Sequence, residues 1–176
     1  FDGTVEEIEK NFPSEIKSKK LKLLSLKYNS GSSGSYIECL PYMEQGWNYM
    51  LKMDEDVILD QSCLSEMIKV AKKDDSISMI GGKVFYKKNP EIIQAIGSKL
   101  KPYFAIAKGI GINENNVDRF SEQLDLDGLN GCMVLISRVI YDQIGWFDAD
   151  YFLYYDDHDL MYKSLRHGFR HVFVPS

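Results

Sequence analysis

Short apolar runs alternate along the chain with segments whose apolar residues recur at helical spacing. The runs at residues 21–26, 48–53 and 77–86 predict buried strands, and residues 35–44 and 62–72 predict helices. Strands that alternate with helices are typical of an α/β domain with a mostly parallel sheet. Ligands of such sheets gather beyond the carboxyl ends of the strands, so the loops that follow the first two strands are the first places to expect chemistry.

The rest of the chain shows a less even pattern. Thr4 to Glu7 match a capping box at the start of a helix that Pro13 ends. Residues 89–123 have little periodicity, and irregular chain of that length inside a domain is usually functional or mobile. Strands are predicted over residues 131–136 and 172–174, and helices over residues 139–144 and 156–167, the last one capped by Gly168.

Composition and charge describe one globular domain. The 176 residues include 21 basic and 26 acidic side chains, a net charge of −5, and 44% of them are hydrophobic. These values exclude a disordered, fibrous or disulfide-stapled protein, and the scattered basic residues argue against a nucleic-acid binder. Cys39, Cys63 and Cys132 have spacings typical of neither zinc nor redox sites, which favours a reducing compartment. No apolar run reaches the ~18 residues that a membrane span needs.

Two aspartates follow the second predicted strand directly. Side chains alternate in an extended segment, so Asp54 and Asp56 should leave the strand end on one side while Glu55 points away. Two carboxylates one pleat apart suit Mg²⁺ or Mn²⁺ held partly by substrate phosphates, although a plain polar strand end has the same appearance. An EF-hand is excluded, because Leu59 and Ser65 would stand at its glycine and glutamate positions.

A second acidic cluster, Asp156-Asp157-His158-Asp159, begins the last long helix. The helix dipole favours negative charge there, but three carboxylates in four residues exceed what a cap needs. Their mutual repulsion should raise the pKa of at least one of them, and an unpaired carboxyl group in a cleft is what a general base requires. His158 is either a metal ligand or, more commonly for a lone helical histidine, a partly buried or solvated side chain.

Five segments follow one another in a specific order, and together they cover nearly the whole chain. They are Asn29-x-Gly31-x-x-Gly34, Met53-Asp54-Glu55-Asp56, Gly131-Cys132-Met133, Ile144-Gly145-Trp146-Phe147-Asp148 and the stretch from Tyr151 to Leu160. Their order and spacing resemble those of family 2 glycosyltransferases with the GT-A fold. The chain is most similar to the bacterial rhamnosyltransferase and galactofuranosyltransferase group, where an acidic pair plus Asp-Leu follows an aromatic strand.

The resemblance implies an inverting enzyme that moves a sugar from a nucleotide-diphosphate donor to a hydroxyl of a glycan or lipid-linked acceptor. It implies a GT-A α/β domain over residues 1–176, with a mostly parallel central sheet flanked by helices, and Mn²⁺ or Mg²⁺ as cofactor. Such enzymes build bacterial cell-surface polysaccharides, so we expect a cytoplasmic protein, peripheral to the inner face of the membrane if its acceptor is lipid-linked.

The resemblance also implies a role for each matching residue. Asp54 and Asp56 would hold the metal, with Asp54 near the donor's ribose and sugar, while Asp157 would be the general base and Asp156 would position the acceptor. Further substrate-binding residues implied by the family are Asp2, Asn29, Gly31, Gly131 and Trp146. Packing in the core is an alternative for Trp146, and equally for Tyr154.

The chain departs from the family pattern at both ends. Phe1-Asp2-Gly3-Thr4 is similar to the tail of the family's Asp-x-Ser-x-Asp-Gly-Thr segment, without the strand that grips the nucleotide base and without an initiator methionine or signal peptide. Related enzymes also place a metal-binding histidine shortly after the strand that ends at Val174-Pro175. We therefore expect an N-terminally truncated domain that by itself binds donor poorly when measured by calorimetry.

Two other functions compete with glycosyl transfer. Asp2-Gly3-Thr4 also echoes the Asp-x-Asp-Gly-Thr loop of haloacid dehalogenase-like phosphatases, but the nucleophile would precede residue 1 and no later Gly-Asp-x-x-x-Asp segment follows. A non-catalytic carbohydrate- or protein-binding module on a degenerate GT-A fold is the stronger rival. Such a module has no reason to keep Asp56 and Asp157, and both are present.

Overall fold

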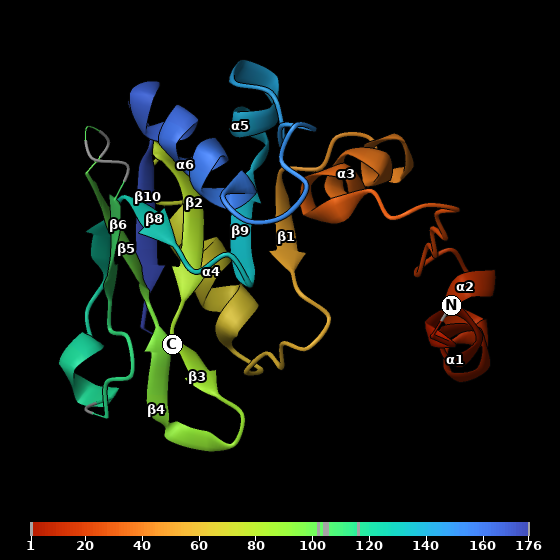
Figure 1. Cartoon of the computed structure of the whole chain (residues 1–176), viewed down its shortest axis with the longest axis horizontal. Helices are drawn as coiled ribbons and strands as arrows, with labels where there is room; N and C mark the ends of the chain where they lie inside the picture. Colours follow the sequence, from red (N-terminus) through yellow and green to blue (C-terminus); the bar gives the residue numbers. More distant parts are fainter. Residues whose placement is uncertain (1, 102, 104–105, 116, 176) are drawn as a thin grey trace.

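A mixed five-stranded sheet forms the centre of the computed structural model, which describes residues 2–101, 103, 106–115 and 117–175. The strand order is β1-β9-β2-β10-β7. In that order the strands are Tyr49–Met53, Met133–Ser137, Ile77–Gly82, Arg170–Val174 and Leu124–Leu126. Figure 1 shows β10, β2, β9 and β1 side by side, with helices in front of and behind the sheet.

The strand directions correct the expectation of a mostly parallel sheet. Among the described strands of this sheet, β2 and β10 are the one parallel pair, whereas β9 runs antiparallel to both β1 and β2, and β7 runs antiparallel to β10. The apolar run of β9 is buried over Met133–Ile136. A strand buried on both faces is apolar throughout in either direction, so hydrophobic patterning cannot report its orientation.

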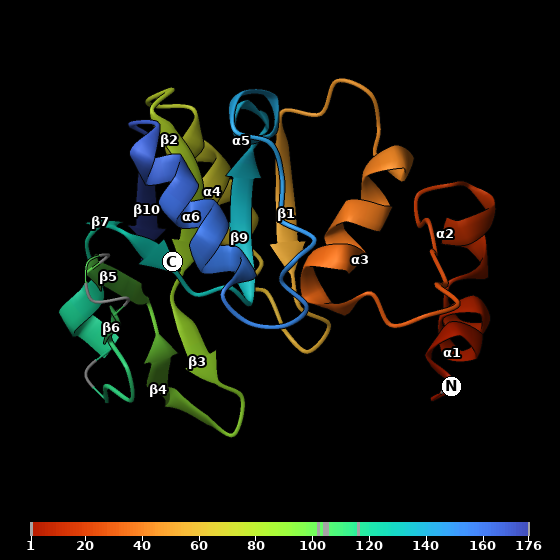
Figure 2. The same ribbon diagram turned by 45° about the horizontal axis from the view of Figure 1, so that its top comes forward.

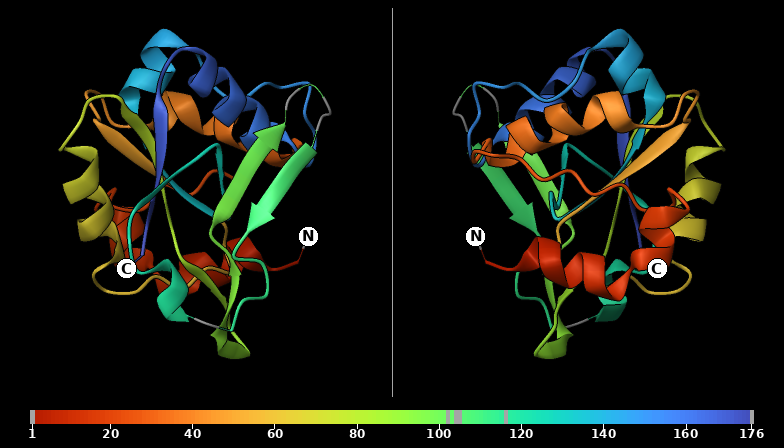
Figure 3. Two further views of the ribbon diagram at one scale, coloured as in Figure 1. Left: turned by 90° about the vertical axis from the view of Figure 1, so that its left-hand side faces the viewer. Right: turned by 90° about the vertical axis from the view of Figure 1, so that its right-hand side faces the viewer.

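Helices cover both faces of the sheet and create two cores. Helix α4, Cys63–Ala71, packs on one face, and α5, Arg138–Gln143, with α6, Asp156–Arg166, packs on the other (Figure 3). Alternating side chains of each strand supply both cores: in β2, Met79 faces the α6 side and Ile80 faces the α4 side. The result is a three-layer arrangement, as the alternation of strands and helices predicts.

Paired strands occupy much of residues 89–123, where the sequence shows little periodicity. Strand β3, Val84–Tyr86, pairs with β4, Asn89–Ala95, and a three-stranded sheet has the order β6-β5-β8. The remaining elements here are β5 Gly97–Lys101, β6 Ile106–Ile110, the 3₁₀ turn η3 Val117–Phe120 and β8 Gly128–Leu129. Register shifts interrupt the β3–β4 ladder, and such bulges break the two-residue period that would have revealed the strands. The predicted strand over residues 77–86 is likewise divided at Lys83.

The N-terminal helices lie beside the sheet rather than on it (Figure 2). They are α1 Thr4–Asn11, α2 Pro13–Lys17, α3 Gly31–Cys39 and the 3₁₀ turn η1 Leu40–Tyr42. The predicted capping box at Thr4 to Glu7 is wrong. Gly3, with φ 84°, is the N-cap of α1, and Asp2 Oδ1 accepts a hydrogen bond from the Thr4 amide at 3.0 Å. The helix predicted from residue 35 begins at Gly31, and residues 21–26 form no ladder with any strand in the described part of the chain.

Within the described residues, no helix combines the length and the apolar character needed to cross a membrane.

A buried histidine links β10 to helix α6. His171 is 1% exposed, and its Nδ1 lies 2.9 Å from the Asp127 carbonyl oxygen while its Nε2 lies 3.0 Å from Ser164 Oγ. Burial lowers the pKa of His171 to about 4, an effect that the Asp127 carbonyl only partly opposes. The imidazole is therefore neutral in the folded protein at physiological pH.

This histidine should make the protein less stable in mild acid. As pH falls from about 6.5 to about 4, the unfolded chain gains a proton at His171 that the folded protein does not, so the free energy of unfolding should drop by up to about 3 kcal/mol. The stabilisation is complete above pH 6.5. Urea unfolding at pH 7.5 and at pH 5 measures the drop, and a His171→Gln variant should show a shallower one; equal drops in the two proteins would contradict the assignment.

Candidate active site

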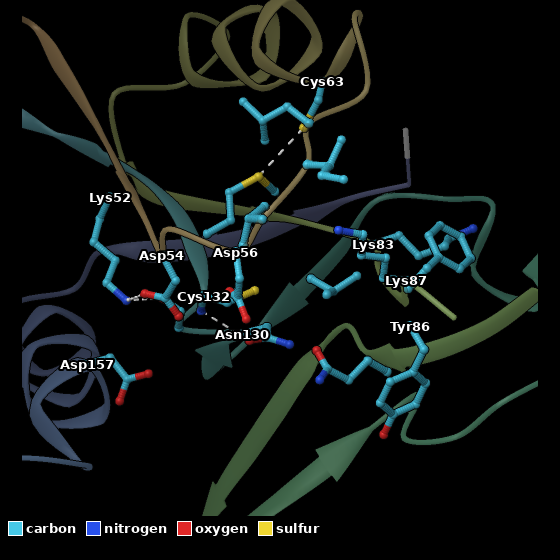
Figure 4. A pocket seen from close by; sticks show the side chains of 18 of the residues that line it. Lys52, Asp54, Asp56, Cys63, Lys83, Tyr86, Lys87, Asn130, Cys132 and Asp157 are labelled. Atoms are coloured by element: carbon cyan, nitrogen blue, oxygen red, sulfur yellow. Dashed lines mark hydrogen bonds and ion pairs between the residues drawn. The ribbon is translucent and has the colours of Figure 1, made fainter. Parts of the chain in front are cut away.

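A cleft of about 1320 Å³ opens beyond the carboxyl end of β1. Its walls come from the β1 end, the β3–β4 hairpin, the loop before β9 and the start of α6. Figure 4 shows Asp157 on one side of Asp54 and Asp56, with Lys83 and Lys87 of the hairpin region on the other. Elements far apart in the sequence thus contribute charged side chains to one cavity.

Asp54 and Asp56 both line the cleft, whereas Glu55 between them lies outside its lining. The Asp54 amide donates to the Cys132 carbonyl at 2.9 Å, which continues the β1–β9 pairing by one step. A turn follows at once, since the Val57 amide donates to the Asp54 carbonyl at 3.3 Å. The strand end therefore sets the position of the first carboxylate through backbone bonds.

Sequence reasoning missed Lys52, a buried cation on β1. Its side chain is 8% exposed, and its Nζ donates to Asp54 Oδ1 at 2.9 Å and to the carbonyl oxygen of Gly131. Burial opposes the charge, but Tyr36 and Asp54 raise the pKa of Lys52, so it stays protonated. The sequence feature that could have revealed it is a single lysine inside the apolar run Tyr49–Met53, which predicts a buried charge.

Asp157 is held by its neighbour His158. Asp157 Oδ1 accepts from the His158 amide at 2.7 Å and lies 2.9 Å from His158 Nδ1. Burial by itself would raise the pKa of Asp157, but the hydrogen bonds and charge of His158, with a contribution from Lys52, hold it below its usual range. Repulsion within the acidic cluster is expected to raise the pKa of at least one of its carboxyl groups, but at Asp157 the pKa is lowered instead. The same contact raises the pKa of His158, and burial opposes the rise.

Gly131 leaves room for the Asp157 carboxylate. A Cβ atom at Gly131 would lie 1.9 Å from Asp157 Oδ2, so any side chain at this position would displace the carboxylate. The same glycine accepts the hydrogen bond from Lys52 through its carbonyl oxygen. The loop thus contacts both acidic clusters.

Asp156 lines the cleft but is also a structural residue. It is 5% exposed, and its Oδ2 accepts from Ser32 Oγ at 2.6 Å. The Ser32 amide donates to the Phe152 carbonyl at 2.8 Å, and a Cβ at Gly31 would lie 2.2 Å from that same oxygen. The start of α3 is therefore fastened to the segment that leads into α6. Asp159, by contrast, forms an ion pair with Lys163 one turn further along α6, which stabilises the helix itself.

Four of the predicted substrate-binding residues lie outside the lining of the cleft: Asp2, Asn29, Gly31 and Trp146. Asp2 binds the Thr4 amide, Asn29 Oδ1 accepts from the Gly31 amide at 2.9 Å, and Gly31 packs against Phe152. Trp146 donates from Nε1 to the Tyr36 carbonyl at 3.3 Å and contacts the rings of Trp47, Tyr141 and Phe147. The core-packing alternative for Trp146 is thus the one that the structure favours, whereas Tyr154 is 73% exposed.

The donor set suits a cation that shares its ligands with a substrate. Within the described residues, no three His, Cys, Asp or Glu side chains gather into a closed metal site. Asp54 and Asp56 nevertheless supply two carboxylates on one cleft, the number with which Mg²⁺ or Mn²⁺ is held when diphosphate oxygens and water complete its shell. His158 Nδ1 is engaged with Asp157, which leaves that nitrogen to the carboxylate rather than to a metal.

Comparisons with known proteins identify the family and the fold of the chain. The family model described as "Glycosyltransferase like family 2" matches residues 37–176. No curated protein matches the chain. Among solved structures, that of GalNAc-T7 with UDP, GalNAc and Mn²⁺ is similar at a TM-score of 0.71 and 15% identity, covering 99% of this chain and 34% of that one. The chain thus spans about a third of that protein, and the likeness shows the GT-A fold.

Replacing Asp157 should lower the pKa of its neighbour. In Asp157→Asn, His158 loses the carboxylate that stabilises its protonated form, while burial still disfavours the charge, so the pKa of His158 should fall. NMR titration of the imidazole protons measures the shift. His171 lies on β10 and contacts Asp127 and Ser164, so its titration should be unchanged. A His158 titration that does not move would show that the Asp157 contact is absent in solution.

Replacing Lys52 should destabilise the fold. Lys52→Met leaves the Gly131 carbonyl without its donor and Asp54 without its counter-charge, at an expected cost of about 1–3 kcal/mol in the free energy of unfolding. Lys69→Met is the matched control, because Lys69 is exposed on α4 and forms an ion pair with Glu66 one turn away, an interaction worth little. Denaturant unfolding of both variants compares them, and equal effects would mean that Lys52 is not a buried anchor.

Proposed function

The chain belongs to the glycosyltransferase-like family 2, and from that premise we propose that it transfers a sugar from a nucleotide-diphosphate donor to an acceptor hydroxyl with inversion. The observation that carries the proposal is the meeting of Asp54, Asp56 and Asp157 on one cleft, from two elements on different sides of it. An inverting displacement needs a base on the face opposite the leaving group, and separate walls of one cleft supply that separation.

Asp157 is the proposed general base. Its lowered pKa keeps the carboxylate ionised at neutral pH, and the bonds from His158 fix its orientation. The acceptor oxygen forms a bond to the anomeric carbon as the bond from that carbon to the diphosphate oxygen breaks. The acceptor's proton passes to Asp157, and the nucleoside diphosphate leaves. Asp156, which precedes this carboxylate, is the proposed acceptor-positioning residue, and Gly131 beside it is a proposed substrate-binding residue.

Asp54 and Asp56 are the proposed ligands of Mn²⁺ or Mg²⁺. When bound, the ion neutralises negative charge that develops on the departing diphosphate. Lys52 donates to one oxygen of Asp54 and thereby orients that carboxylate before any ligand arrives. From the family resemblance, we also propose that Asp54 contacts the ribose and the sugar of the donor.

The finer substrate identity rests on the resemblance alone. We propose a rhamnosyl or galactofuranosyl donor and a glycan or lipid-linked acceptor of bacterial cell-surface polysaccharide synthesis, because the stretch Tyr151–Leu160 is most similar to that group. A cytoplasmic protein at the inner face of the membrane follows from such an acceptor. The family match removes the phosphatase alternative, and the non-catalytic module is the outcome that the next experiment tests.

Two substitutions should separate the roles of the acidic clusters. In the full-length parent of the expected truncated domain, with a panel of nucleotide sugars and Mn²⁺, Asp157→Asn should lower transfer by about 10²–10⁴-fold. Donor binding should persist, because the substitution removes the proton acceptor and keeps the shape. Asp56→Ala should instead abolish the dependence of donor binding on Mn²⁺. Calorimetry of donor binding and a radiolabelled transfer assay measure these effects.

Glu55→Gln is the matched control, since Glu55 lies between the two aspartates with an exposed side chain. Its transfer rate and metal dependence should equal those of the unsubstituted protein. If no donor is turned over, or if Asp157→Asn and Asp56→Ala both behave like Glu55→Gln, the protein is a binding module and the proposed chemistry is wrong.

A further inference from the structure

Two neighbouring tyrosines expose their rings at the cleft. Tyr154 and Tyr155 are 73% and 68% exposed, and both line the cavity that contains the acidic clusters. A large aromatic ring in solvent forgoes the stabilisation that burial would provide. The pair therefore contributes little to the core, and its position at the cleft points to a ligand.

The backbone that presents these rings is held in an uncommon conformation. Tyr154 has φ +65° and Tyr155 has φ +63°, in the left-handed region that bulky residues rarely adopt. Hydrogen bonds fix the segment on both sides: the Phe152 carbonyl accepts the Ser32 amide at 2.8 Å, and the Tyr155 carbonyl accepts the Asp159 amide at 2.8 Å. Strain that is held by its surroundings in this way clusters at sites of ligand contact.

The tyrosines adjoin the proposed base. The rings of Tyr155 and His158 meet edge to face with centroids 6.2 Å apart, and His158 Nδ1 lies 2.9 Å from Asp157 Oδ1. A ligand resting on the tyrosines would therefore lie close to the Asp157 carboxylate. The diphosphate of a donor belongs instead with the metal ligands Asp54 and Asp56.

The local charge selects the kind of ligand. Asp157 lies at the α6 end of the cleft, and Lys83 and Lys87 lie at the hairpin end (Figure 4). Asp156, which also lines the cleft, directly precedes Asp157 at the start of α6. Carboxylates disfavour an anionic ligand beside them but accept hydrogen bonds from hydroxyl groups. Aromatic faces bind the C–H face of a sugar ring, and phenolic hydroxyls can bond its hydroxyls. A neutral, hydroxyl-rich ring fits both features.

We propose that Tyr154 and Tyr155 form an acceptor subsite that binds a neutral sugar ring and directs one of its hydroxyls toward Asp157. The inference rests on the proposed function for the identity of the acceptor. It adds to that function the substrate class, which is an uncharged glycosyl acceptor. It also adds Tyr154 and Tyr155 as residues that determine specificity for this acceptor.

Binding of methyl hexopyranosides tests the subsite directly. Saturation-transfer NMR with a panel of these glycosides needs neither donor nor turnover. Tyr154→Asn and Tyr155→Asn remove a ring but keep a residue that tolerates positive φ, whereas Tyr154→Phe and Tyr155→Phe keep the ring. We expect each Asn variant to weaken glycoside binding by about threefold to tenfold and each Phe variant to bind nearly as the unsubstituted protein does.

Two controls separate ring contact from general damage. Tyr42→Asn removes a tyrosine that is 53% exposed on η1, outside the cleft lining, and should leave glycoside binding unchanged. Thermal unfolding of the Tyr154 and Tyr155 Asn variants should occur at or above the temperature of the unsubstituted protein, because asparagine relieves the backbone strain.

The outcomes distinguish this inference from the proposed function. Mn²⁺-dependent hydrolysis of the donor by the unsubstituted protein reports on the function without any acceptor. If glycosides bind through the tyrosines while no donor is hydrolysed, the transferase proposal fails and the carbohydrate subsite stands. If no glycoside in the panel binds, or if the Asn variants bind as tightly as the unsubstituted protein, the subsite is overturned.

Discussion

One buried ammonium group connects the two acidic clusters of this protein. Lys52 donates to Asp54, two residues after it in the sequence, and to the Gly131 carbonyl, 79 residues after it. A buried charge is tolerated only with partners, so the lysine constrains the strand end and the loop before β9 together. Gly131 in turn abuts the Asp157 carboxylate. The relative position of the proposed metal ligands and the proposed base therefore depends on this one side chain.

Hydrogen bonds from Ser32 fix the position of the segment that precedes helix α6. Ser32 bonds Asp156 and the Phe152 carbonyl, across 124 residues in the first case. These bonds hold the αL segment that exposes Tyr154 and Tyr155. Both adjacent aspartates line the cleft, but Asp156 is 5% exposed and bonded to Ser32, whereas Asp157 is bonded to His158. Asp156 therefore combines a structural contact with its proposed role in positioning the acceptor, and Asp157 is the proposed base.

The three-layer frame explains why so much chemistry meets at one place. Strands β1, β2 and β10 run in one direction, with β9 inserted antiparallel between the first two. The carboxyl end of β1 and the loop before β9 therefore meet at the same edge of the sheet, because antiparallel neighbours bring the end of one strand to the start of the other. Helices on both faces bury the strands, so polar groups accumulate at this edge rather than within the layers.

Periodicity and residue order predicted α4, α5, α6 and strands β1, β9 and β10, together with the two acidic clusters and the family that orders them. They did not predict the direction of β9, the hairpins of residues 84–110 or the N-cap at Gly3. Hydrophobic patterning reports which side chains are buried, and burial is the same for either strand direction. Only the tertiary structure decided that Trp146 packs in an aromatic cluster while Tyr154 faces solvent, and that Lys52 joins Asp54 to Gly131. Those outcomes depend on contacts between segments distant in the chain, about which local sequence carries no information.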